Sequence, residues 1–203
     1  MSVQERIENA LSDLHSKEKI EIVGCGRTDT GVHAYDYFCH VDLPETTDIE
    51  ILHTKLNRML PSSILIAHIE EKAADWHARF DAKKRTYRYF VSTQKDPFQQ
   101  DTSWFYTRPF DLDKMNEACQ YVLGRQDFTS FSKLHTDVKT NFCTVHSAEW
   151  FQTSEHTYYF EISADRFLRN MVRATVGTLM DVGIGKIAPE EIKTILADLQ
   201  VLG

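Results

Sequence analysis

A carboxylate beside an arginine in a glycine-rich segment is the most chemically suggestive feature of this sequence. The segment GCGRTDTGVHA holds Arg27 and Asp29 two positions apart, between Gly26 and Gly31. An extended backbone would place both side chains on one face, and the glycines allow turns that lift the segment away from a sheet. A nearby arginine favours the ionised carboxylate. Asp29 is therefore a candidate nucleophile, although an aspartate that only caps a turn is the commoner use of so short a pattern.

The elements that must position this segment are predicted from hydrophobic periodicity and from capping and turn residues. The predicted helices cover 3–14, 48–59, 112–122, 168–182 and a short stretch after Pro189. The predicted strands cover 20–23, 35–43, 64–69, 85–92, 145–151 and 157–162. Helices and strands alternate in two similar rounds, which favours an α+β fold with two helix-backed, mainly antiparallel sheets flanking a central cleft.

This alternation also suggests how the chain is organised. We expect an N-terminal half over residues 1–98 that carries the Asp29 segment, and a C-terminal half over 99–203 that completes the cleft. The two halves are expected to form one continuous catalytic unit.

Composition restricts the class of protein. The chain has 203 residues, of which 42% are hydrophobic and 26% charged, as in an ordinary folded protein. It has neither an apolar run of the ~18 residues that cross a bilayer nor the pattern of a signal peptide, so we expect a cytoplasmic protein that does not enter the membrane. Its four cysteines are widely separated and its histidines lack an HExxH arrangement, so we expect reduced thiols and no metal.

The formal net charge of -7 argues against a nucleic acid as partner, because phosphate binding draws on lysine and arginine. The basic residues are nevertheless concentrated in two stretches, which can form local basic surfaces on an acidic protein. They are Arg79, Lys83, Lys84, Arg85 and Arg88 in the first stretch, and Arg166, Arg169 and Arg173 in the second.

Four stretches of the sequence resemble, in the expected order, the TruA-type tRNA pseudouridine synthases. They are GCGRTDTGVHA, WHARFDAKKRTYRYFV, GRQDFTSF and DRFLRNMVRATVGTLMDVG. The resemblance implies the pseudouridine synthase fold. It departs at both ends, because the family's first strand, with a YDGTxYxGWQ-like stretch, and its last strand, with GLYL-like residues, have no counterpart here.

The resemblance implies a role for each matching residue. Asp29 would be the catalytic aspartate and Arg173 its salt-bridge partner, with Tyr87 bordering the same cleft and stacking on the target uracil. Arg27 would fill or stabilise the space that the flipped uridine leaves. The phosphate-binding residues would be Arg79, Lys83, Lys84, Arg85, Arg88, Arg166 and Arg169. Taken without the resemblance, Tyr87 fits a core aromatic residue and the basic residues fit a solvated surface.

The activity implied by the resemblance is the isomerisation of uridine to pseudouridine in the anticodon arm of tRNA, at positions 38 to 40, by a homodimer without a cofactor. The sequence does not decide whether Asp29 would attack ribose C1′ or uracil C6. The alternative is a truncated, non-catalytic module that binds tRNA or assists its folding, which the two missing strands favour. A hydrolase of another N-glycoside would need a second positioned acid, and none is evident.

Overall fold

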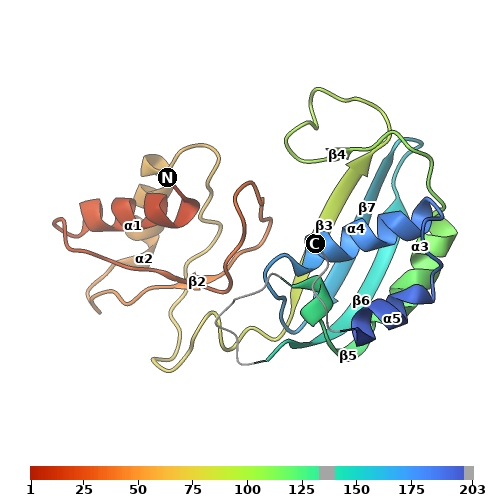
Figure 1. The fold of residues 1–203 in the computed structure, drawn as a ribbon. Coiled ribbons are helices and arrows are strands. Elements are labelled where there is room, and N and C mark those ends of the chain that lie inside the picture. Colours follow the sequence, from red (N-terminus) through yellow and green to blue (C-terminus); the bar gives the residue numbers. More distant parts are fainter. Residues whose placement is uncertain (133–139, 199–203) are drawn as a thin grey trace. The chain divides into compact units, whose positions relative to one another are not determined.

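A computed structural model describes residues 1–132 and 140–198 and divides the chain into two compact units, Met1–Ala82 and Lys83–Gly203 (Figure 1). The boundary expected at residue 98 lies inside the second unit. The physical reason is that strand β3, Arg85–Ser92, pairs along its whole length with strand β7, Thr157–Ala164. Strand β3 lies before residue 98 in the sequence but belongs to the sheet of the second unit.

Two amphipathic helices form the core of the first unit. Helix α1, Val3–Leu14, starts at a capping box in which Ser2 and Glu5 exchange hydrogen bonds, as predicted. Helix α2, Ile49–Met59, starts at Asp48, whose side chain accepts a hydrogen bond from the Ile51 N–H. The buried apolar residues that pack together around these helices are Ala10, Leu11, Ile22, Leu52, Leu56 and Leu60.

The sheet of the first unit is smaller than the sequence suggests. Strands β1, Val23–Gly24, and β2, Cys39–His40, form an antiparallel pair of two residues each. The strand predicted over 64–69 is not formed. The Ile66 N–H donates instead to the Asn57 side chain (2.9 Å), and the Ile66 carbonyl accepts from that side chain (2.9 Å) and bonds His53 of α2 (2.7 Å). The hydrogen-bonding groups of the Ile66 main chain are therefore satisfied by side chains of α2 and not by a neighbouring strand.

A five-stranded sheet forms the centre of the second unit, in the order β4-β3-β7-β6-β5. The remaining strands are β4 (Trp104–Phe105), β5 (Gly124–Asp127) and β6 (Phe142–Gln152). Every neighbouring pair is antiparallel except β3 and β4, which are parallel. The prediction of an α+β fold with two sheets is confirmed, and the hairpin predicted over 145–162 is formed by β6 and β7.

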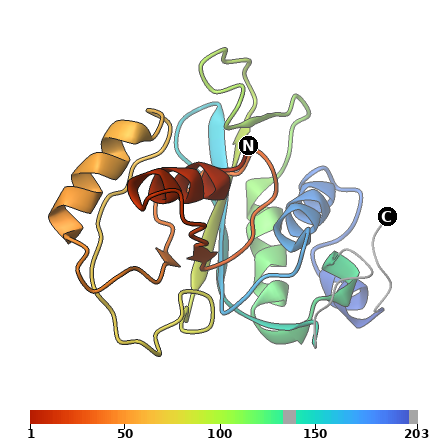
Figure 2. The same ribbon diagram turned by 90° about the vertical axis from the view of Figure 1, so that its left-hand side faces the viewer.

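Three helices lie on one side of this sheet (Figures 1 and 2): α3 (Leu112–Cys119), α4 (Met171–Gly183) and α5 (Glu191–Ala197). Short 3-10 helices, η1 (Gln120–Val122) and η2 (Thr129–Phe131), lie on either side of β5 in the sequence. Trp150, Phe160 and Met115 are fully buried between the helices and the sheet. Helix α4 starts three residues later than predicted, because Asn170 before it has a left-handed backbone (φ 72°) that interrupts a helix.

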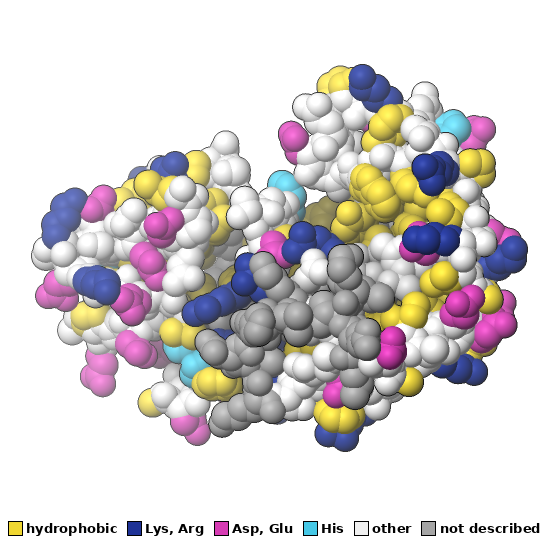
Figure 3. Space-filling model, in the orientation of Figure 1, with side chains coloured by type: hydrophobic (Ala, Val, Ile, Leu, Met, Phe, Trp, Pro, Cys, Tyr) yellow, Lys and Arg dark blue, Asp and Glu magenta, His cyan; other side chains and the backbone are white. Residues whose placement is uncertain are grey.

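Two surface properties complete the description. No helix in the described part of the chain combines the length and the apolar character needed to span a bilayer. Trp104 and Phe105 of β4 are exposed, and Figure 3 shows hydrophobic side chains gathered on the visible face of the second unit near this strand.

Candidate active site

The glycine-rich segment forms a loop that leaves the small sheet of the first unit between β1 and β2. The two strands pair at Val23 with His40 and at Gly24 with Cys39, and the Cys25 N–H donates to the Phe38 carbonyl (2.8 Å). The residues between these points extend away from the pair. Arg27 and Asp29 lie in this excursion, and both are exposed.

The base of the loop is closed by Tyr37. Its hydroxyl donates a hydrogen bond to the carbonyl oxygen of Gly26. The ring passes so close to Gly24 that a Cβ at this position would overlap the tyrosine hydroxyl. A side chain at residue 24 would therefore have to displace the Tyr37 hydroxyl from the base of the loop.

A tight turn follows Asp29. The Val32 N–H donates to the Asp29 carbonyl (3.4 Å), and Gly31, the third residue of the turn, has φ +84°. A turn with positive φ at this position favours glycine. The bond that closes the turn uses the main-chain oxygen of Asp29.

The second family-like stretch packs onto the strand beside the loop. His40 of β2 accepts a hydrogen bond from the Ala78 N–H through Nδ1 (3.1 Å), and its ring lies 4.7 Å from that of His77. His77 in turn accepts from the Arg79 N–H (3.1 Å) and donates its own N–H to the Asp81 carboxylate (2.7 Å). Arg79 is thus held in a turn next to β2, in the same unit as Asp29.

Tyr87 and Tyr89 lie on the helix-facing side of β3 in the second unit. Both are half-buried and pack against the core. The ring of Tyr87 stands perpendicular to that of Phe167, at a centroid distance of 5.0 Å. Burial raises the pKa of Tyr89, and the positive charge of Arg173 opposes that rise, so Arg173 lies near this side of β3.

Arg173 occupies the first turn of α4 and is exposed. Most residues of this helix are buried or half-buried, but Arg173 and Gly177, one turn apart, form its exposed strip. A guanidinium in this position reaches the surface beside the tyrosines and not the core.

Several of the basic residues gather at one end of the five-stranded sheet. Arg85 starts β3 opposite Ala164, the last residue of β7, so Lys83 and Lys84, just before β3, and Arg166, just after β7, lie at this end. Arg88 is different. It lies on the sheet face opposite Tyr87, where it pairs with Glu161 (2.7 Å) and covers the ring of Tyr159 (5.1 Å).

The structure therefore gathers the candidate residues in two places. Arg27 and Asp29 share a loop of the first unit, while Tyr87 and Arg173 lie on one side of the sheet in the second unit. The salt bridge expected between Asp29 and Arg173 would join the two units and stays a prediction.

Three residues that support these groups were not singled out by the sequence. Tyr37 closes the loop, Phe167 packs on Tyr87, and the Asp165 main chain binds Arg85. Phe167 and Asp165 both belong to the stretch DRFLRNMVRATVGTLMDVG, so the motif itself was the available signal. Tyr37 had no such signal beyond its position between the loop and β2.

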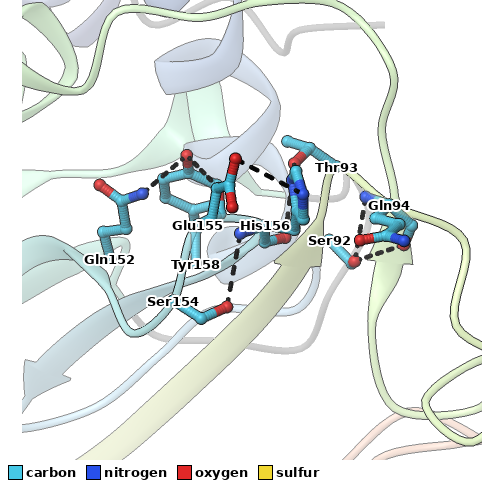
Figure 4. Close-up of polar contacts among 8 residues, drawn as sticks. All are labelled: Ser92, Thr93, Gln94, Gln152, Ser154, Glu155, His156 and Tyr158. Carbon is cyan, nitrogen blue, oxygen red and sulfur yellow. Dashed lines mark hydrogen bonds and ion pairs between the residues drawn. The ribbon is translucent and has the colours of Figure 1, made fainter.

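A second polar cluster lies at the opposite end of β3 (Figure 4). There the Thr93 hydroxyl lies 3.3 Å from His156 Nδ1, and Tyr158 accepts a hydrogen bond from the Gln152 amide (3.2 Å). An adjoining pocket of about 350 Å³ is lined by Thr93, Pro109, Phe110, Leu112, Gln152 and Tyr158. None of these residues belongs to the four family-like stretches. In residues 1–132 and 140–198, no three His, Cys, Asp or Glu side chains are arranged to hold a metal ion.

Known proteins resemble this chain over nearly its whole length. A family model described as tRNA pseudouridine synthase matches residues 118–200. The tRNA pseudouridine synthase A of Bacteroides fragilis is 47% identical over 197 residues, which are 97% of this chain and 78% of the relative. The proteins of the same name from Porphyromonas gingivalis and Bacillus subtilis are 46% and 39% identical, over 96% of this chain and 78% and 80% of their own lengths. The chain therefore belongs to the tRNA pseudouridine synthase family.

Proposed function

We propose that this protein isomerises uridine to pseudouridine in the anticodon arm of tRNA, with the Asp29 carboxylate as nucleophile. Membership of the family supports the isomerisation of uridine in tRNA. The observation that carries the role of Asp29 is the loop between β1 and β2, which is closed at its base by Tyr37 and presents an exposed carboxylate just before a glycine turn.

The reaction exchanges one glycosidic bond for another. The bond between ribose C1′ and uracil N1 breaks, the base turns, and a bond forms between C1′ and C5. The proton leaves C5, and N1 carries a proton in the product. The reactant and product have the same oxidation level, so the reaction needs neither an oxidant nor a reductant.

An ionised carboxylate can serve this exchange in two ways. Attack of Asp29 on C1′ would hold the ribose covalently while the free base turns, and attack on C6 would hold the base instead. Both routes need an oxygen that carries a lone pair and negative charge. Replacing one carboxylate oxygen by an amide nitrogen removes this property with almost no change in shape.

The other candidate residues have supporting roles in this proposal. Tyr87 would stack on the flipped uracil, an interaction worth about 1 to 3 kcal/mol per base, and its half-buried ring is held by the core on one side. Arg173, exposed on α4, would pair with the Asp29 carboxylate. Arg27 would occupy the space from which the uridine has flipped.

Binding of tRNA would use the basic residues at the end of the sheet. Lys83 and Lys84 directly precede β3 and Arg166 closely follows β7, so positive charge from distant parts of the sequence meets there. Arg169 would contribute from the segment before α4. Arg79 would contribute from the first unit. Because structured RNA is recognised largely through its backbone and shape, such a surface suits a folded tRNA despite the net negative charge of the chain.

We also propose that the protein is a homodimer. Sedimentation equilibrium would test this by measuring its mass in solution.

The test is the release of tritium from tRNA whose uridines are labelled at C5, since isomerisation expels this hydrogen. The wild-type protein should release it, and Asp29→Asn and Asp29→Ala should abolish release while tRNA binding is kept. Asp36→Asn, which neutralises another exposed acid of the same loop, is the matched control and should retain activity.

Two results would contradict the proposal in different ways. Substantial release by Asp29→Asn would reject Asp29 as the nucleophile. A wild-type protein that binds tRNA but releases no tritium from any tRNA would instead indicate a non-catalytic tRNA-binding module.

A further inference from the structure

The segment between β7 and α4 packs an aromatic side chain against Tyr87. The ring centroids of Phe167 and Tyr87 are 5.0 Å apart, and the ring planes meet at 89°. Both residues are half-buried and pack against the hydrophobic core of the second unit. Perpendicular packing of two aromatic rings stabilises a structure beyond the burial of their area. This contact is therefore strong enough to favour one orientation of the Tyr87 ring.

The segment that carries Phe167 is fixed at both ends. At its start, the Asp165 carboxylate accepts hydrogen bonds from the N–H groups of Thr144 (2.8 Å) and Arg166 (2.7 Å), and the Asp165 N–H donates to the Thr144 carbonyl (3.1 Å). Arg85 of β3 donates to the Asp165 carbonyl (2.7 Å). At its far end, Leu168 is buried in the core. Phe167 thus lies between two anchored residues.

The orientation of the Tyr87 ring depends on such a neighbour. The terminal torsion of a tyrosine side chain has a broad energy profile, so the backbone of β3 does not by itself determine the ring plane. A base can stack only on a ring whose face is turned toward it. The ring of Phe167 contacts that of Tyr87, and the position of Phe167 is set by the anchored segment.

We propose that Phe167 is a positioning residue, which holds the Tyr87 ring in the plane that stacks on the flipped uracil. This inference rests on the stacking role proposed for Tyr87. The effect of Phe167 should appear in turnover and not in the affinity for tRNA, because stacking on Tyr87 matters only after the uridine has left its helix.

The test compares kcat, the Kd for tRNA and the melting temperature of three variants. Phe167→Leu keeps apolar volume but removes the ring, and should lower kcat by roughly 2- to 10-fold with Kd unchanged. This range corresponds to the energy of one aromatic ring pair. Phe167→Tyr keeps the ring and should retain kcat. Phe151→Leu is the matched control: it removes the ring stacked on Tyr159 (4.9 Å) on the opposite face of the same sheet and should leave kcat unchanged.

A double-mutant cycle with Tyr87→Leu separates this inference from the role of Tyr87 itself. If Phe167 acts through Tyr87, then adding Phe167→Leu to Tyr87→Leu should not lower kcat further. An unchanged kcat in Phe167→Leu, beside a lowered kcat in Tyr87→Leu, would overturn the positioning role and leave the stacking role intact. An unchanged kcat in Tyr87→Leu would overturn both. A loss in Phe167→Leu that adds in full to that of Tyr87→Leu would show that Phe167 acts independently of Tyr87.

Discussion

The guanidinium of Arg85 lies 2.7 Å from the main-chain carbonyl oxygen of Asp165, to which its Nη1 donates a hydrogen bond. This bond joins the first residue of β3 to the first residue after β7. It gives Arg85 a structural task that its neighbours Lys83 and Lys84 do not share, because both lysines are exposed and precede the strand. Of these three consecutive basic residues, Arg85 is a structural residue, whereas Lys83 and Lys84 are exposed surface residues.

Replacing Arg85 by alanine should reduce the stability of the second unit. The Asp165 carbonyl would lose its charged donor, and a hydrogen bond of this kind contributes about 1 kcal/mol in a half-buried position. A lower melting temperature in calorimetry should report the loss. Lys84→Ala is the matched control at the neighbouring exposed position, and equal melting temperatures for the two variants would contradict the structural role of Arg85.

The sequence predicted best those elements whose signals are local. Helix α2 follows from Asp48 and from apolar spacing within the helix itself, and β3 follows from alternation along Arg85–Ser92. The strand predicted over 64–69 failed because its apolar pattern does not reveal that Asn57 would satisfy the main chain of Ile66. These hydrogen bonds depend on how α2 packs against the segment around Ile66, and the alternation of apolar residues within that segment carries no information about this packing.

The candidate site shows the same division. The motifs singled out Asp29 and Tyr87 as candidates, because the proposed reaction needs a carboxylate and an aromatic ring. They did not reveal that Phe167 contacts Tyr87, because the two rings meet only once β3 and β7 are paired. The exposure of Arg173 likewise depends on packing, because α4 is buried on most of its surface and exposed along the strip of Arg173 and Gly177.

Tyr37→Phe should impair turnover while leaving the fold intact. The variant removes the hydroxyl that donates to the Gly26 carbonyl and so loosens the base of the loop that carries Asp29. A hydrogen bond contributes about 0.5 to 1.5 kcal/mol, which corresponds to a loss of roughly 2- to 10-fold in kcat if all of it lowers the activation free energy. Steady-state kinetics on tRNA would measure it. Tyr35→Phe, at a ring that is 93% exposed, is the control, and an equal effect in both variants would argue against the closure by Tyr37.

The buried thiols of the second unit should resist alkylation at pH 8 in the native protein. Burial raises the pKa of Cys119 to about 12 and that of Cys143 to about 11. Raising a thiol pKa lowers the thiolate fraction at a given pH, so at pH 8 about one Cys143 in a thousand would be the reactive thiolate. Mass spectrometry after iodoacetamide treatment, with and without urea, would compare both sites. Similar alkylation rates with and without urea would show that these thiols are not buried. The same assay would test whether each variant described above is folded.

Affinity for tRNA should fall steeply with salt, and Lys83 and Lys84 should account for part of this dependence. Each phosphate contact releases counterions whatever the net charge of the protein, and contributes roughly 0.7 to 0.9 to the slope of log K against log salt concentration. Lys83→Ala/Lys84→Ala should therefore weaken binding and flatten the slope by up to roughly twice this amount, without the loss of stability expected for Arg85→Ala. Lys95→Ala/Lys114→Ala is the matched control, because it removes the same charge after the far end of β3 and on α3. If the first pair leaves affinity and slope unchanged, the RNA does not cross this segment, and Arg166 and Arg169 become the residues to replace.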